Sequence, residues 1–224
     1  MSPSPRTVLV IGANRGIGLS LAKRLKALGR AVIATCRQSS PALDALGVRV
    51  EAGVEVTRDA SVAALAARLE GTVLDELICN AGILLEDDLD GLDLADVQRQ
   101  IEVNALGPLR VVKALHGNIR RGGKLALITS RMGSIGDNGS GGYYGYRMSK
   151  AALNAAGVSM ARDLRGAGIA VAILHPGFVR TDMTSGSGSV APDDAAKQLC
   201  DRLDALTLET TGTFWHASGQ VLPW

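Results

Sequence analysis

A tyrosine and a lysine four residues apart, Tyr146 and Lys150, are the residues in this sequence best suited to proton transfer. If the segment is helical, the two side chains lie one above the other on the same face. A phenol has a pKa of about 10, but a nearby ammonium group stabilises the phenolate and lowers that pKa. A phenol tuned in this way can protonate a carbonyl oxygen or deprotonate an alcohol. The same spacing also arises by accident on helix surfaces, so the rest of the chain must decide between the two interpretations.

A glycine-rich turn near the N-terminus predicts a phosphate site. Residues 7–11 form an apolar run typical of a strand buried on both faces, and residues 19–28 have the pattern of an amphipathic helix that ends at Gly29. Between them stand Gly12, Gly16 and Gly18. Glycines permit a tight turn and close approach of the backbone, and the helix N-terminus offers free N–H groups. The alternative is a turn that serves the fold only.

Two arginines favour NADP(H) over NAD(H) as the nucleotide. Residues 31–36 read as a second strand, and Arg37 follows at its carboxyl end. In a dinucleotide fold an acidic residue at that place holds the ribose hydroxyls, whereas a cation can hold a 2′-phosphate. Arg15 lies in the glycine turn, within reach of the same phosphate. Either arginine alone could be a solvated surface charge, but the two together indicate a phosphate.

Strands and helices alternate along the rest of the chain. The hydrophobic pattern predicts strands at 48–56 (interrupted by Gly53), 74–79, 124–129, 169–174 and a short last one within 212–224. It predicts helices at 61–69, 94–119, from Tyr146 to 164, and 193–203. This alternation is typical of an α/β protein with a doubly wound parallel sheet. No linker divides the chain, so we expect a single domain over residues 1–224.

Composition narrows the class of protein. The formal net charge is +2 and aromatic residues make up 3%, which gives no basis for nucleic-acid binding. The three cysteines, Cys36, Cys79 and Cys200, form no Cys-x-x-Cys motif, so we expect free thiols, no metal site and a reducing compartment. Residues 1–6 lack the apolar stretch of a signal peptide, and the apolar runs are of strand length. We therefore expect a cytoplasmic protein without a membrane segment.

Taken in order, the motifs resemble those of the classical short-chain dehydrogenase/reductase family over essentially the whole chain. The resemblance is carried by Gly12-x-x-x-Gly16-x-Gly18, Asn80-Ala81-Gly82, Asn104, Ser130, Tyr146-x-x-x-Lys150 and Pro176-Gly177. Residues 35–37 and 175–183, the glycine-rich insert before Tyr146 and the Leu-Pro-Trp ending are similar to those of the sniffer and C-factor-like carbonyl reductases. The resemblance implies a Rossmann-type sheet of about seven strands with helices on both faces.

The resemblance also implies a role for each motif residue. Tyr146 would be the general acid/base, and Lys150 would lower its pKa and hold the nicotinamide ribose. Ser130 would donate a hydrogen bond to the substrate oxygen, with Ser134 as the competing assignment, and Asn104 would position a water that connects Lys150 to solvent. The implied contacts to NADP(H) come from Gly12, Asn14, Arg15, Gly16, Ile17, Gly18, Arg37, Glu55, Val56, Asn80, Ala81, Gly82, Tyr146, Lys150, Pro176, Gly177, Val179 and Thr181. Glu55 stands where the family usually has Asp, which leaves the adenine contact open.

These observations predict an NADPH-dependent oxidoreductase that reduces a ketone or aldehyde to an alcohol, reversibly. The alternative is a nucleotide-binding signalling or sensor protein of the C-factor type, and a third is a structural module that binds no nicotinamide. The family forms a two-fold interface through its long helices, so we expect a homodimer or homotetramer. The segment between Met183 and Ala191 is short and rich in Ser and Gly. It would leave the substrate site open, or a partner subunit would complete it.

Overall fold

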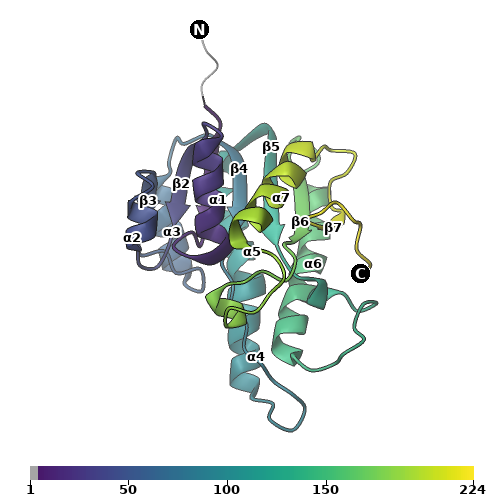
Figure 1. Ribbon diagram of the computed structural model, residues 1–224. Helices are drawn as coiled ribbons and strands as arrows, with labels where there is room; N and C mark the ends of the chain where they lie inside the picture. The colour runs from purple at the N-terminus through teal and green to yellow at the C-terminus, as the bar shows by residue number, and fades with distance from the viewer. Residues whose placement is uncertain (1–4) are drawn as a thin grey trace.

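Seven parallel strands form one sheet at the centre of the computed structural model, which describes residues 5–224 (Figure 1). The strand order is β3-β2-β1-β4-β5-β6-β7. The strands are β1 (Thr7–Ile11), β2 (Ala31–Thr35), β3 (Arg49–Glu51), β4 (Leu74–Cys79), β5 (Ile119–Ile128), β6 (Ala170–His175) and β7 (Phe214–His216). The sheet confirms the predicted Rossmann-type fold.

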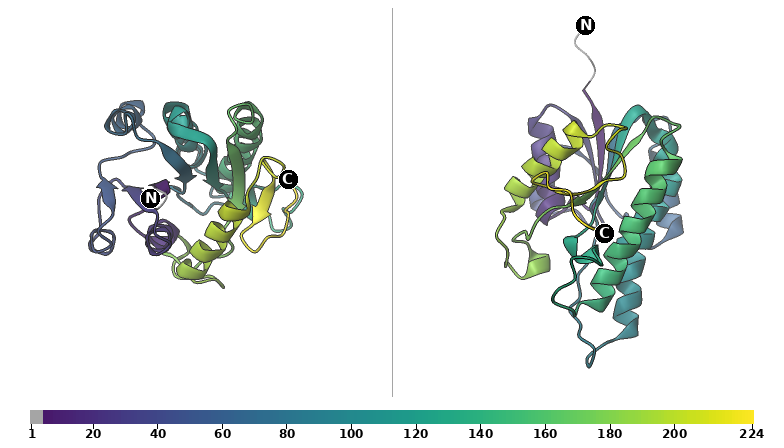
Figure 2. Two further views of the ribbon diagram at one scale, coloured as in Figure 1. Left: turned by 90° about the horizontal axis from the view of Figure 1, so that it is seen from above. Right: turned by 90° about the vertical axis from the view of Figure 1, so that its right-hand side faces the viewer.

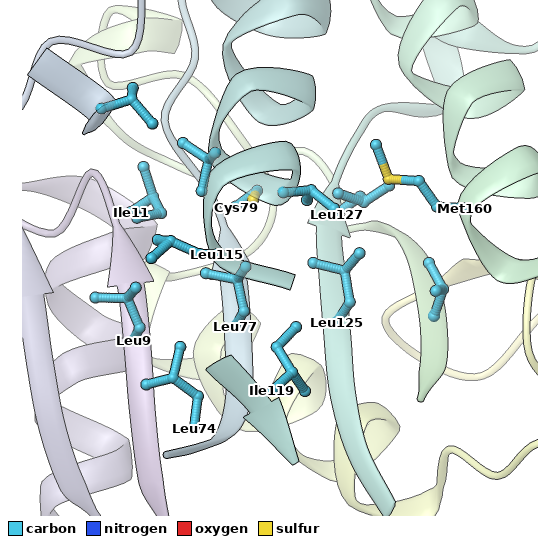
Figure 3. Close-up of a cluster of buried hydrophobic side chains, with 14 of the residues drawn as sticks. Leu9, Ile11, Leu74, Leu77, Cys79, Leu115, Ile119, Leu125, Leu127 and Met160 are labelled. Atoms are coloured by element: carbon cyan, nitrogen blue, oxygen red, sulfur yellow. The ribbon is translucent and has the colours of Figure 1, made fainter. Parts of the chain in front are cut away.

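Helices cover both faces of the sheet, as the view from above shows (Figure 2). The helices are α1 (Gly16–Ala27), α2 (Pro41–Asp44), α3 (Asp59–Arg68), α4 (Leu94–Ile101), α5 (Gly107–Leu115), α6 (Tyr144–Asp163) and α7 (Pro192–Ala205). Because strand side chains alternate between faces, Leu9 packs toward α3, α5 and α6, whereas Val10 packs toward α1 and α7. Figure 3 shows the first of these two cores, where Leu9 and Leu77 lie beside Leu115 and Leu125.

The strand order reverses between β1 and β4. The chain runs outward from β1 to β3, then crosses back to place β4 on the other side of β1, with Ile11 paired to Cys79. In open α/β sheets a crevice forms at such a reversal, outside the carboxyl ends of the strands. The glycine turn after Ile11 and the Asn80-Ala81-Gly82 turn after Cys79 therefore meet at one edge of the sheet.

The prediction of one continuous helix over residues 94–119 is wrong. α4 ends at Ile101, a π-helical segment η1 (Glu102–Leu106) follows, and α5 ends at Leu115. The wider turn of η1 surrounds Asn104, whose buried side chain bonds to another segment, and π-helical turns of this kind often occur at functional sites. After a short 3-10 turn η2 (His116–Asn118), Ile119 already belongs to β5.

The other boundaries differ by a few residues. β3 is shorter than the predicted strand at 48–56 because the chain turns at Gly53, which has φ +75°. The four-residue helix α2 was not predicted; Pro41 begins it and the Ser40 side chain caps it. Gly29 does end α1, with φ +75°. Within residues 5–224 no helix has both the length and the apolar character needed to cross a membrane.

Candidate active site

A cleft of about 880 Å³ opens at the carboxyl edge of the sheet. Its walls come from the segments that follow β1 to β6, together with the start of α6. The structure brings most of the predicted site residues into this one cleft: Gly12, Asn14, Arg15, Gly16, Ile17, Arg37, Glu55, Val56, Asn80, Ala81, Gly82, Ser130, Tyr146, Lys150, Pro176, Gly177, Val179 and Thr181. Gly18 and Asn104 lie behind its surface.

The glycine turn packs tightly against the end of β4. A Cβ on Gly12, where φ is +80°, would lie 2.8 Å from the Ala81 Cα. A Cβ on Gly18 would lie 2.0 Å from the Gly12 carbonyl oxygen, which already accepts a hydrogen bond of 2.7 Å from Asn80 Nδ2. Gly18 therefore shapes the turn from behind and does not line the cleft, and its predicted contact with the nucleotide stays a prediction.

The N-terminus of α1 is suited to bind an anion. Its N-cap residue, Arg15, gives no side-chain cap hydrogen bond, and its first turn holds no acidic residue. The first N–H groups of a helix need a partner, and the helix dipole favours a negative one. Gly16 and Ile17 at this terminus line the cleft. These N–H donors suit the pyrophosphate of a dinucleotide.

Both arginines expected at a 2′-phosphate stand at the cleft, and each has a carboxylate nearby. Arg15 Nη1 lies 3.0 Å from Asp182 Oδ2, and Arg37 Nη1 lies 3.7 Å from Glu55 Oε2. No sequence pattern predicted the pairing with Asp182, since 167 residues separate the partners. The two arginine side chains are largely exposed. Exposed ion pairs are weak, so an incoming phosphate can compete with these carboxylates.

Tyr146 and Lys150 lie on the face of α6 that borders the cleft, as their spacing predicts. Lys150 Nζ is 5.7 Å from the centroid of the Tyr146 ring and donates a hydrogen bond of 3.1 Å to the carbonyl of Ile128. Ser130 follows β5 directly and borders the same cleft. The buried Ser134 hydroxyl instead accepts a hydrogen bond from Asp137 N and does not reach the cleft.

Burial moves the pKa values of the pair in directions that the spacing does not predict. It raises the pKa of Tyr146 to about 12, and the Ser130 hydroxyl lowers that pKa only in part. It lowers the pKa of Lys150 to about 8. The expectation that Lys150 would pull the phenol pKa below its usual value is therefore wrong for the cofactor-free protein. Desolvation disfavours the charged form of both groups.

Asn104 lies behind the cleft with no exposed surface. Its Oδ1 accepts a hydrogen bond of 2.8 Å from Ile83 N, and its Nδ2 donates to the Ile83 carbonyl and to Ser149 Oγ. A Cβ on Gly82 would lie 3.2 Å from Asn104 Oδ1 and 3.6 Å from Lys150 Nζ. The glycine therefore keeps open the space between these two side chains.

Three cleft residues with nitrogen-bearing side chains were missed by sequence reasoning. His175 ends β6, His216 ends β7 beside it, and their rings meet edge to face with centroids 5.1 Å apart. Burial, with help from His216 and Arg131, lowers the pKa of His175 to about 3, so its ring is neutral at physiological pH. His175 stood in the His175-Pro176-Gly177 motif, but nothing in the sequence placed His216 or Arg131 next to it.

The Ser/Gly-rich segment forms a compact loop at the cleft mouth. Val179 pairs with Val190, and the Thr184 hydroxyl bonds to the carbonyls of Val179 and Ser187, at 2.9 and 2.6 Å. Phe178 and Met183 border the cleft and remain partly exposed. The loop contains only the short 3-10 turn η4 (Asp182–Thr184), so it gives the cleft a rim but no helical cover.

The site therefore combines a phosphate-binding end with a phenol, a hydroxyl and an ammonium group at the other end. Among residues 5–224, no three His, Cys, Asp or Glu side chains gather closely enough to hold a metal ion. Such an arrangement can bind a dinucleotide and move a proton to or from a small molecule beside it. The cleft, its strand-reversal position and these residues are those of a nucleotide-dependent oxidoreductase fold.

Comparison with known proteins identifies the family. The sequence model of the short chain dehydrogenase family matches residues 6–190. The chain therefore belongs to the short-chain dehydrogenase family, as the motifs indicated. It is 46% identical over 224 residues to 1-hydroxy-2-glutathionyl-2-methyl-3-butene dehydrogenase from Rhodococcus sp. strain AD45, with 97% of this chain and 99% of that protein covered. It is also 44% identical over 154 residues to C-signal from Myxococcus xanthus, covering 67% of this chain and 93% of that protein.

Solved structures agree with the subgroup. The carbonyl reductase Sniffer of D. melanogaster superposes with a TM-score of 0.91 at 27% identity, over 98% of this chain and 100% of that one. The NADPH-bound carbonyl reductase from chicken fatty liver has a TM-score of 0.87 at 32% identity, over 98% and 99% of the two chains. The resemblance to sniffer and C-factor-like proteins is thus confirmed at the level of sequence and fold.

Proposed function

We propose that this protein is an NADPH-dependent carbonyl reductase that also runs in reverse as an alcohol dehydrogenase. The observation that carries the proposal is the meeting of Ser130, Tyr146 and Lys150 on one wall of the cleft that holds the free N-terminus of α1. When bound, NADPH supplies a hydride to the carbonyl carbon. The protein must then orient the carbonyl group and supply the proton that its oxygen needs.

Each of these side chains has a distinct role in the proposal. The Tyr146 phenol donates its proton to the substrate oxygen as the carbonyl becomes an alcohol, and it takes a proton back in the reverse direction. Its raised pKa keeps it protonated at neutral pH, which suits the reductive direction. The Ser130 hydroxyl donates a hydrogen bond to the same oxygen. Lys150 binds the nucleotide ribose, and Asn104 positions a water that connects Lys150 to solvent.

We propose a preference for NADP(H) because two guanidinium groups, Arg15 and Arg37, stand at the nucleotide end of the cleft. Carboxylates compensate both groups in the cofactor-free protein, and a 2′-phosphate would take their place. A bound phosphate receives charge-assisted hydrogen bonds from guanidinium groups, often in pairs. The ribose hydroxyls of NAD(H) offer no such charge, so the arginines would discriminate between the two nucleotides.

The substrate class is proposed from the cleft and from the Rhodococcus relative. That relative is named for the oxidation of an alcohol carrying a glutathionyl group. Here the substrate end combines Phe178 and Met183 with Arg131 and the two histidines, an apolar surface beside hydrogen-bond donors. Such a wall suits alcohols and carbonyls that carry a polar or anionic substituent. The compact rim loop leaves room for a large substituent.

Cofactor consumption with a substrate panel tests the proposal. Purified protein is given NADPH with ketones and aldehydes, or NADP+ with alcohols, and absorbance at the nicotinamide band is followed. Each panel includes hydroxyalkyl and oxoalkyl thioethers of glutathione beside simple analogues of the same carbon skeleton. We expect turnover, faster with NADPH than with NADH. Failure of every carbonyl and alcohol, under conditions in which NADPH binds, would overturn the proposal.

The C-signal relative supports a second candidate, a nucleotide-binding signalling protein with incidental turnover. Both candidates require NADPH to bind, but only the first requires proton transfer by Tyr146. The complete set of Asn104, Ser130, Tyr146 and Lys150 favours the enzyme, because a sensor needs no proton donor in its cleft. Binding of NADPH without turnover of any compound in the panel would favour the sensor.

A further inference from the structure

Three successive backbone N–H groups at the start of α6, those of the N-cap residue Tyr143 and of Tyr144 and Gly145, donate to one residue from a distant segment, Asp87. Its carbonyl accepts from Tyr143 N at 2.8 Å, its Oδ2 accepts from Gly145 N at 3.1 Å, and its Oδ1 accepts from Tyr144 N. Helix termini leave four N–H groups without partners, and a carboxylate is the strongest acceptor for them. Asp87 thus supplies the N-terminal cap of the helix that carries Tyr146, which stands directly after these three residues.

The helix cannot cap itself. Its N-cap residue, Tyr143, has φ +54° and gives no side-chain cap hydrogen bond, and the first turn of α6 holds no acidic residue. Gly141 and Gly142 before it also have positive φ. A non-glycine residue in this region is strained and persists only where its surroundings hold it. The contacts from Asp87 to Tyr143 and its two successors hold this turn in place.

The segment that leads to Asp87 is held by side chains of α4 and η1. Gln100 in α4 accepts a hydrogen bond from Leu85 N at 2.9 Å and donates to the Leu85 carbonyl at 3.3 Å. Asn104, four residues further on, makes the same two bonds to Ile83. Residues four apart on a helix lie on one face. Gln100 and Asn104 can therefore bond to two residues of the same neighbouring segment, Leu85 and Ile83. Both amides have no exposed surface.

The same helix fits closely against the start of α6. A Cβ on Gly145 would lie 2.5 Å from Gln100 Nε2 and 3.0 Å from the Val97 Cα, so only glycine permits this approach. Figure 1 shows α4 and α6 side by side, both reaching beyond the carboxyl edge of the sheet. In the segment that leads to Asp87, Leu84 and Glu86 line the cleft.

We propose that Asp87 is a positioning residue of the reaction, which fixes the start of α6 and with it the places of Tyr146 and Tyr143 in the cleft. The proposal rests on the proposed function. Asp87 does not line the cleft, so it acts through the helix and does not contact the substrate. The part of the cleft wall formed by Leu84, Glu86 and Tyr143 would then move as one unit with the phenol. Displacing a reacting group by about 1 Å can reduce a rate by roughly a hundredfold.

Two substitutions and a control test the role. Asp87→Ala removes both carboxylate acceptors, and Asp87→Asn keeps the shape and one acceptor oxygen. Asp88→Ala is the matched control, because the neighbouring Asp88 is exposed and accepts only from Gly91 N within its own turn, at 2.7 Å. The measurements are kcat and KM for a carbonyl, the Kd for NADPH, and hydrogen exchange of the amides of residues 143–145.

We expect Asp87→Ala to lower kcat by about ten- to a hundredfold. The Kd for NADPH should change far less than kcat, since most of the proposed nucleotide contacts, in the glycine turn and the arginines, lie on other segments. Asp87→Asn should recover part of kcat, and Asp88→Ala should match the wild type. If Asp87→Ala does not fold, the Asn variant carries the test. A kcat equal to wild type in Asp87→Ala, or in Asp87→Asn when the amides of 143–145 have lost their protection, would overturn the proposal.

Hydrogen exchange separates this proposal from the proposed function. The amides of Tyr144 and Gly145 should exchange slowly in the wild type and in Asp88→Ala, and at least tenfold faster in Asp87→Ala, whether or not a substrate is known. If the wild type turns over no carbonyl while this exchange pattern holds, the proposed function is wrong, but the capping of α6 by Asp87 is confirmed. If turnover is found and Asp87→Ala changes neither exchange nor kcat, the role of Asp87 fails alone.

Discussion

Lys150 Nζ lies 5.7 Å from the centre of the Tyr146 ring, and its hydrogen bond goes to the Ile128 carbonyl at 3.1 Å. Both side chains are almost completely buried, at 8% and 4% exposure for Tyr146 and Lys150. Burial of the pair therefore decides its protonation: a protonated phenol and a lysine that loses its proton near pH 8. The four-residue spacing brings the groups together, but it does not by itself create a low-pKa phenol.

Tyr146→Phe should lower carbonyl reduction by about 10²- to 10⁴-fold, because it removes the proton donor and keeps the ring. The protein should still fold and bind NADPH. Tyr144→Phe is the control, since Tyr144 is partly exposed and does not line the cleft. Steady-state rates and NADPH titration check both variants. Reduction at the wild-type rate, where hydride transfer limits that rate, would remove Tyr146 from the mechanism.

Lys150→Met should stabilise the cofactor-free protein at neutral pH while it weakens NADPH binding. A lysine pKa that falls from 10.5 to about 8 on folding corresponds to a cost of roughly 3 kcal/mol below pH 8. The lost hydrogen bond to Ile128 offsets about 1 kcal/mol of the gain. We expect a rise of about 2 kcal/mol in the free energy of unfolding at pH 7, measured by urea denaturation.

The sign of the pH dependence gives a second check on Lys150. Between pH 8 and 10.5 the unfolded lysine still binds a proton that the folded one has released, so wild-type stability gains from this group as pH rises. The advantage of Lys150→Met should therefore shrink over that window and be absent above it. An advantage that is constant from pH 7 to 10 would mean that burial does not depress the lysine pKa.

Arg37→Asp should weaken NADPH binding by about ten- to a hundredfold, since one charge-assisted contact to a phosphate contributes roughly 1.5–3 kcal/mol. NADH binding should change far less. Glu55→Gln should have the opposite effect on NADPH, because it frees Arg37 from the carboxylate 3.7 Å away. Arg99→Gln, in an exposed pair with Asp96 on α4, serves as the control. A wild-type protein that prefers NADH in fluorescence titration would refute the assignment.

A homodimer or homotetramer is expected from the exposed apolar side chains at the α5 and α6 faces. Leu106, Leu109 and Met148 are 38%, 39% and 51% exposed in the single chain. Covering them against a twin helix pair would remove this surface from water. Light scattering at micromolar concentration should give at least twice the chain mass of 23.2 kDa. A mass near 23.2 kDa would contradict the expectation.

The sequence by itself determined the features that depend on neighbours along the chain. Runs of apolar residues predicted the strands, and glycines at three positions predicted the turn before α1. The spacing of Tyr146 and Lys150 predicted their common face on α6, because helical periodicity is local. Sequence order also placed Ser130 at the end of β5, and the cleft holds Ser130 but not Ser134.

Features that depend on contacts between distant segments could not be predicted from the sequence. The predicted helix over 94–119 missed the π-helical segment at Asn104, whose side-chain bonds go to Ile83 on another segment. The pairing of His175 with His216 follows from the register of β6 and β7. No local pattern records which residue will be opposite another across a sheet, since register depends on the packing of the whole layer.

Only the tertiary structure decided the electrostatics of the site. Arg15 meets Asp182 and α6 receives its cap from Asp87 because the chain folds back at the carboxyl edge of the sheet. The pKa of Tyr146 rises because the folded protein excludes water from the phenol. The four-residue spacing of Tyr146 and Lys150 does not predict this desolvation. Local periodicity depends on bonds between near neighbours, whereas desolvation and cross-cleft pairing depend on which surfaces the fold brings together.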